Sequence, residues 1–83
     1  METQIKQFML RALLAARDVP MPETTLRSVT RNAFPHVAIT TEVLGACIAG
    51  LKEHNLIAST DDDIAGTIWM LTGKGIIRAE KLA

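Results

Sequence analysis

The chain is poor in the residue types that build stapled or aromatic-rich proteins. Among its 83 residues it has one cysteine, no tyrosine, one tryptophan and two phenylalanines. A single thiol has no partner for a disulfide within the chain, and Cys47 stands among apolar neighbours, where a thiol usually serves as a small core residue. We therefore expect a fold that depends on packing alone, in a reducing cytoplasm.

An excess of charge of either sign is also missing, because nine basic residues balance nine acidic ones. No global field attracts a polyanion or an anionic membrane, so electrostatic binding must be local. The longest apolar run, Ala12 to Ala16, is too short to span a bilayer, and the start Met1-Glu2-Thr3-Gln4 lacks the basic head of a signal peptide. The sequence thus predicts a cytoplasmic protein that does not enter a membrane.

Catalytic and metal-binding motifs are absent from the sequence. Neither His36 nor His54 has a Cys, Asp or Glu at metal-ligand spacing. The run Asp61-Asp62-Asp63 lacks the glycine and the distal glutamate of a calcium loop, so it indicates a solvated acidic turn. No glycine-rich phosphate loop or nucleophile motif occurs. We expect no enzyme activity, no metal and no cofactor.

The length and composition indicate one ordered domain that covers residues 1–83. Hydrophobic residues make up 48% of the chain and charged residues 22%, which is typical of a globular protein. The chain is near the lower limit at which a single core stabilises itself, so a partner subunit is a reasonable expectation.

The first predicted helix runs from a cap at Thr3 to about Arg17. Its core face repeats at helical spacing through Ile5, Phe8, Met9, Ala12, Leu13 and Ala16. Leu10 and Leu14 fall outside this face and form a second apolar strip four residues apart. Either the C-terminal helix or a second copy of the chain must cover that strip, so Leu10 and Leu14 are candidate dimer contacts.

Prolines separate the next two predicted helices. Asp18 to Pro22 stops the first helix, and Pro22 suits the first turn of a second helix that ends at about Phe34. This helix directs Arg27 and Arg31 outward. Pro35 ends it, and Thr40 caps a third helix. The third helix buries apolar residues spaced three and four apart: Val43, Leu44, Cys47, Ile48 and Leu51.

The remaining chain predicts a hairpin and a closing helix. Asn55 tolerates the left-handed conformation at a helix end, after which 56–58 and 67–71 form two strands around a turn from Ser59 to Gly66. If Trp69 and Leu71 are buried, Ile68 and Met70 point outward. Thr72 caps a last helix that ends at about Leu82. The fold class is therefore mainly α with a two-stranded β-wing, in the order helix-helix-helix-strand-strand-helix.

Two segments carry a resemblance to a known family. Leu51-Lys52-Glu53-His54-Asn55-Leu56-Ile57 precedes the wing, and Leu71-Thr72-Gly73-Lys74-Gly75 follows it. With the element order, they make the chain resemble small bacterial winged helix-turn-helix regulators of the MarR, ArsR and PadR kind, in which glycine commonly stands at the position of Asn55. The resemblance implies DNA binding, a role in transcription regulation, and a homodimer formed through the first and last helices.

The resemblance places six residues on the outer face of the helix that would enter a major groove: Thr40, Thr41, Glu42, Gly45, Ala46 and Ala49. This face is poor in the side chains that read bases and phosphates, and Asp61 to Asp63 stands where the family often has a basic residue. The candidate DNA-contact residues are Arg27, Arg31, Thr40, Thr41 and Lys52. Together they favour a weak or atypical contact with duplex DNA, although exposed arginines and capping threonines are also ordinary surface features.

The same third helix supports a different hypothesis, which is contact with a protein. Gly45, Ala46, Ala49 and Gly50 form small-residue pairs four apart, and each glycine costs roughly 1 kcal/mol of helix stability relative to alanine. Such a face admits a partner helix, or else it packs on the first or second helix within the monomer. Ile68 and Met70 on the acidic wing extend the candidate protein-contact surface. A small accessory or prophage-encoded protein would fit this alternative.

Overall fold

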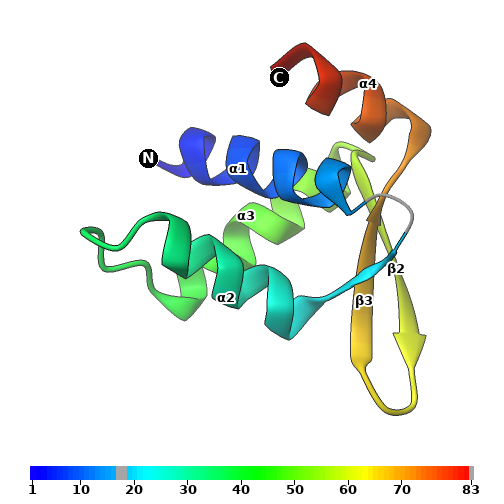
Figure 1. Ribbon diagram of the computed structural model, residues 1–83, viewed down its shortest axis with the longest axis horizontal. Coiled ribbons are helices and arrows are strands. Elements are labelled where there is room, and N and C mark those ends of the chain that lie inside the picture. Colours follow the sequence, from blue (N-terminus) through cyan, green and yellow to red (C-terminus); the bar gives the residue numbers. More distant parts are fainter. Residues whose placement is uncertain (17–18, 83) are drawn as a thin grey trace.

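The computed structural model describes residues 1–16 and 19–82 and contains four helices and three strands in those residues. In chain order these are α1 (Glu2–Ala15), β1 (Met21–Pro22), α2 (Glu23–Ala33), α3 (Thr41–Glu53), β2 (Ile57–Asp62), β3 (Gly66–Leu71) and α4 (Gly73–Leu82) (Figure 1). The chain is mainly helical with a small antiparallel sheet, an arrangement compatible with a winged helix. No helix in the described part of the chain is long and apolar enough to cross a membrane.

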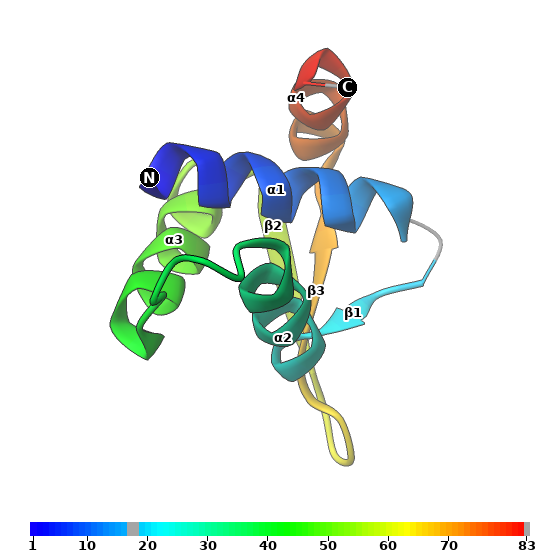
Figure 2. The same ribbon diagram turned by 60° about the vertical axis from the view of Figure 1, so that its left-hand side comes forward.

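Helix α1 lies in the middle of the helical part. Helix α4 packs along one side of α1, and α2 and α3 pack on the other (Figures 1 and 2). The β2–β3 hairpin extends away from the helices (Figure 2). One apolar core joins these elements, and its most deeply buried side chains are Ile5, Met9, Leu26, Leu44 and Cys47. The apolar spacing of α1 and α3 therefore identified much of the core.

The sheet has three strands in the order β1-β3-β2, so the expectation of a two-stranded wing was wrong. The third strand is β1, in which Met21 pairs with Trp69 and Pro22 pairs with Ile68. Met21 precedes a proline and is therefore driven into extended geometry. Pro22 has φ −59° and ψ 146° and lies at the N-cap, so α2 begins at Glu23 rather than at Pro22.

The first helix differs from its prediction at its N-terminal end. It begins at Glu2 with Met1 at the N-cap and no side-chain capping bond, so Thr3 is not the cap. It ends at Ala15, whereas the predicted end at Arg17 and the start of the breaker at Asp18 lie outside the described residues.

The apolar strip of Leu10 and Leu14 was expected to be covered either by the C-terminal helix or by a second copy of the chain. In the structure, α1 packs against α4. Leu10 is only 3% exposed within the single chain, and Leu14 is half-buried against the core. Leu10 is therefore buried within the single chain, on a helix that packs against α4, and does not need a second copy to cover it. The expectation of a dimer through this strip has no support in the structure.

The hairpin turn is shorter than the predicted turn from Ser59 to Gly66. The strands continue to Asp62 and resume at Gly66, which has a φ of 78°. The Asp62 Oδ1 atom accepts hydrogen bonds from the backbone N–H groups of Ile64 (2.8 Å) and Ala65 (2.9 Å). One carboxylate thus closes the turn and allows longer strands.

The two segments that carry the family resemblance contact each other where α3 ends and α4 begins. Asn55 has a φ of 60°, as expected for the residue that ends α3. The Thr72 hydroxyl donates to the Asn55 carbonyl (2.6 Å) and accepts from the Gly75 N–H (3.0 Å), which confirms Thr72 as the cap of α4. The Thr72 N–H donates to the Leu56 carbonyl (3.1 Å). A Cβ atom on Gly75 would collide with that same carbonyl. The glycine that ends the segment Leu71 to Gly75 is therefore required by close packing against Leu56.

We predict that the substitution Gly75→Ala destabilises the protein, while Gly73→Ala does not. Gly75 is pressed against the backbone of Leu56, which cannot move aside cheaply, and overpacking of this kind costs about 1–3 kcal/mol. A Cβ on Gly73 meets open space in the same helix, so that variant should be unchanged or more stable by up to about 1 kcal/mol. Urea unfolding of the two variants measures the difference. Equal stabilities would contradict the packing argument.

Candidate functional site

Four of the five candidate DNA-contact residues meet at the corner where α2 approaches the start of α3. Arg27 donates from Nη1 to the Thr41 carbonyl (3.3 Å), and Arg31 donates from Nη2 to the Thr41 hydroxyl (3.2 Å). The Thr40 hydroxyl accepts from the Val43 N–H (3.2 Å), so Thr40 is the N-cap of α3, as predicted. We call Arg27, Arg31, Thr40 and Thr41 the α2–α3 corner.

The two arginines of this corner form hydrogen bonds within the chain in addition to carrying positive charge. Arg31 donates a second hydrogen bond, from Nε to the Ile39 carbonyl (3.4 Å), so it spans the loop before α3. Arg27 forms an ion pair with Glu23 at 3.1 Å and its side chain is 23% exposed. The charge of Arg27 therefore has a partner within the chain, whereas Arg31 lies on the exposed surface.

Glu23 is the residue of this region that sequence reasoning missed. Its Oε2 atom accepts from Arg27, and its Oε1 atom accepts from the Trp69 indole N–H at 2.9 Å. One carboxylate thus links the middle strand β3 to α2 and, through Arg27, to α3. The spacing of Glu23 and Arg27, four residues apart on one helix, was a usable signal for their pair. No local signal could reveal Trp69 as the other partner, because it lies 46 residues away.

Lys52 lies away from the α2–α3 corner, at the other end of α3. Its Nζ atom is 5.9 Å from the centroid of the Trp69 ring, close enough for a cation–π contact. Lys52 is exposed to solvent. The indole of Trp69 therefore contacts Glu23 through its N–H and Lys52 through its ring face.

The small residues of α3 separate into two pairs. A Cβ on Gly45 would lie 3.7 Å from Arg27 Nη2, and one on Gly50 would lie 2.9 Å from Lys6 Nζ. The glycines therefore face α2 and α1 within the monomer, as the packing alternative proposed. Ala46 and Ala49 are exposed and remain available to a partner.

The hairpin is acidic at its exposed end. Asp61, Asp62 and Asp63 are all exposed, and Asp61 accepts a hydrogen bond from the Thr67 hydroxyl (3.4 Å). Trp69 is buried, at 5% exposed, while Ile68, Met70 and Leu71 are half-buried. Ile68 and Met70 therefore form no large apolar surface, because part of each is already covered.

Reactive and metal-binding groups are sparse in the described residues. Within residues 1–16 and 19–82, no three His, Cys, Asp or Glu side chains are grouped so that they could hold a metal ion. Cys47 is fully buried, with its Sγ atom 3.9 Å from the Glu2 carbonyl oxygen. Burial raises the pKa of the Cys47 thiol, and the negative charge of Glu2 adds to this effect. Cys47 is thus placed as a core residue.

Comparisons of the chain with models of known protein families, with curated proteins and with solved structures gave no match.

We predict that the hairpin turn loosens at acidic pH through Asp62. Hydrogen bonds from the backbone of Ala65 and Ile64 lower the pKa of the Asp62 carboxyl. A lowered pKa in the folded state stabilises the turn above the ordinary Asp value of about 3.9, and this stabilisation is lost as pH falls through the lower, folded-state pKa. Amide-proton shifts of Ile64 and Ala65, followed by NMR, should therefore change below about pH 4.

The control for this titration is the variant Asp62→Asn, whose side-chain oxygen accepts the same hydrogen bonds but does not titrate. Its two amide shifts should stay constant over the same pH range. A transition of equal size in both proteins would exclude Asp62 as the titrating group.

Proposed function

We propose that this protein is a non-enzymatic winged-helix binding module, of the transcription-regulator type, that contacts duplex DNA weakly through the α2–α3 corner. The observation that carries the proposal is the convergence of Arg27, Arg31, Thr40 and Thr41 on the exposed start of α3. In this reading α3 is the recognition helix and the β2–β3 hairpin is the wing.

The chemistry of the corner suits a phosphate group. The first N–H groups of a helix have no acceptor within the helix and carry partial positive charge, which favours an anion. Arg31 stands beside them on the exposed surface, and a guanidinium has five N–H donors, of which two are used within the chain. The remaining donors can bind a phosphate while the helix start stays fixed.

The surrounding charges limit how strong such binding can be. Glu42 lies in the first turn of α3, and three aspartates occupy the end of the hairpin. The candidate surface offers three cations at most, which are Arg27, Arg31 and Lys52. Because each neutralised phosphate contributes roughly −0.9 to the slope of log K against log salt, the slope should be no steeper than about −3. The proposal is therefore for contact with the DNA backbone rather than base-specific recognition.

A protein partner is the second candidate, and a specific observation favours it. Ala46 and Ala49 are exposed on α3, one turn and two turns after the exposed Glu42, so this part of the helix surface is small and uncharged. Such a face can approach another helix closely, while its acidic margin repels phosphate. This alternative replaces the DNA proposal if the chain does not bind duplex DNA.

We predict that Arg31→Gln weakens DNA binding and makes the salt slope shallower by about one, whereas Arg31→Lys retains more of the affinity because it keeps the charge. Both substitutions remove the planar donor group that holds Ile39 and Thr41, so both should destabilise the fold similarly, and only the charge differs. Fluorescence anisotropy with mixed-sequence duplex DNA, at salt concentrations from about 20 to 200 mM, measures both affinity and salt slope. Circular dichroism establishes that each variant is folded.

The matched control is Lys81→Gln, which removes an equal charge from the last turn of α4, far from the corner. Its affinity should equal that of the unsubstituted chain. Absence of binding by the unsubstituted chain at the lowest salt would refute the DNA proposal, as would equal affinities of the Arg31→Gln and Arg31→Lys variants.

A further inference from the structure

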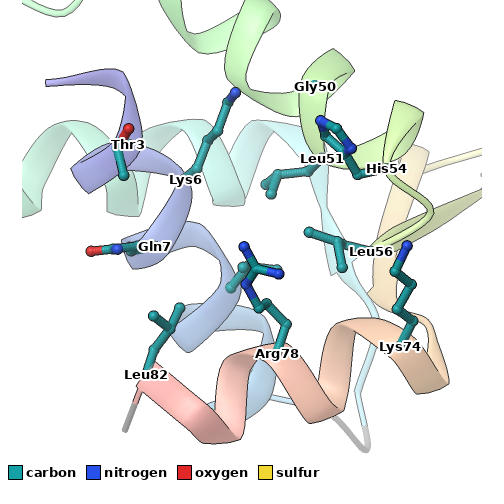
Figure 3. Close-up of a pocket in the computed structure, with 11 residues that line it drawn as sticks. Thr3, Lys6, Gln7, Gly50, Leu51, His54, Leu56, Lys74, Arg78 and Leu82 are labelled. Carbon is teal, nitrogen blue, oxygen red and sulfur yellow. The ribbon is translucent and has the colours of Figure 1, made fainter.

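A cavity of about 330 Å³ lies between α1, the C-terminal end of α3 and α4 (Figure 3). These elements lie on the other side of the molecule from the hairpin tip (Figure 1). Its apolar wall includes Leu10, Leu51 and Leu56, which are 3%, 2% and 7% exposed. Ligand sites of proteins begin at about this volume, so the space suits a small molecule rather than a polymer.

Basic side chains from three different helices surround this cavity. Lys6 comes from α1, His54 follows α3, and Lys74 and Arg78 come from α4 (Figure 3). None of the residues that line the cavity is acidic. Within the described part of the chain, Lys6, Lys74 and Arg78 form no ion pair or hydrogen bond with another side chain. In a chain of zero formal net charge, two lysines, an arginine and a histidine therefore line one cavity, and no carboxylate is among its lining residues.

One of these basic side chains lies close beside the backbone of α3. A Cβ on Gly50 would lie 2.9 Å from Lys6 Nζ and 3.1 Å from Lys6 Cε, so the end of the Lys6 side chain packs against this turn of the helix. Lys6 is also half-buried and is one of the residues that line the cavity.

Lysines on a protein surface are usually solvated and do not by themselves indicate a ligand. Their position around an apolar cavity is a second, separate feature. Here leucine side chains form one wall of the space and positive groups surround it. The two features together match a molecule with an apolar body and a negative head, because burial of the body and a charge-assisted hydrogen bond to the head are favourable at the same time.

We propose that this cavity binds a small organic anion, with its carboxylate or phosphate among Lys6, Lys74 and Arg78 and its apolar body against Leu10, Leu51 and Leu56. This site is separate from the α2–α3 corner and does not depend on the proposed contact with DNA.

Titrations with four probes test the proposal by NMR on the isotope-labelled protein. Octanoate and octyl phosphate carry both an apolar body and a negative head, octanamide lacks the charge, and inorganic phosphate lacks the apolar body. We expect both octyl anions to shift the amide signals of Leu51 and Leu56 and to bind more tightly than octanamide and inorganic phosphate. The stronger of the two octyl anions identifies which head group the site prefers.

The variant Arg78→Gln should weaken binding of the preferred octyl anion by about five- to tenfold, since a partly exposed charge-assisted hydrogen bond is lost. Lys81→Gln is the matched control, because it removes a charge from the same helix but does not line the cavity. Its affinity for the anion should be unchanged.

Three results would overturn the proposal. Equal binding of octanamide and octanoate would show an apolar surface without a role for charge. Inorganic phosphate binding as tightly as octyl phosphate would show a basic patch without a role for the cavity. Equal weakening by Arg78→Gln and Lys81→Gln would show a general effect of net charge.

Discussion

The carboxylate of Glu23 joins three parts of the molecule that are distant in sequence. One oxygen accepts from the indole N–H of Trp69 in the middle strand, and the other accepts from Arg27, whose guanidinium reaches the first residue of α3. Glu23 can do this because Met21 and Pro22 form a strand beside β3, which starts α2 next to Trp69. The short strand β1 therefore determines where α2 begins, and α2 positions α3.

This arrangement limits what the α2–α3 corner can offer to the proposed DNA contact. The same arginines that would contact phosphate also fix the loop and the helix start before α3, so part of their hydrogen-bonding capacity is used within the chain. Positive charge without a partner in the described residues gathers instead around the cavity between α1 and α4. The acidic tip of the hairpin and the basic cavity thus lie on opposite sides of the molecule (Figure 1).

The sequence predicted the elements governed by local chemistry. Helix periodicity identified much of the core, Thr40 and Thr72 capped their helices, and Asn55 took the left-handed conformation. The features that the sequence did not predict depend on contacts between residues far apart in the chain. The strand at Met21 and Pro22 depends on its neighbour β3, and the partnership of Glu23 with Trp69 spans 46 residues, so neither has a local signature. Grouping of Lys6, Lys74 and Arg78 around a cavity likewise depends on how α1 and α4 cross, which periodicity does not specify.

A double-mutant cycle on Glu23 and Trp69 tests most directly whether this carboxylate couples the sheet to the helices. The variants are Glu23→Ala, Trp69→Phe and both together, with the free energy of unfolding measured in urea. If the bond from the indole to the carboxylate links β3 to α2, the two substitutions should be non-additive by about 1 kcal/mol or more. A control cycle of Trp69→Phe with Glu42→Ala should be additive. Additivity within about 0.3 kcal/mol for the Glu23 cycle would contradict the central role assigned to this residue.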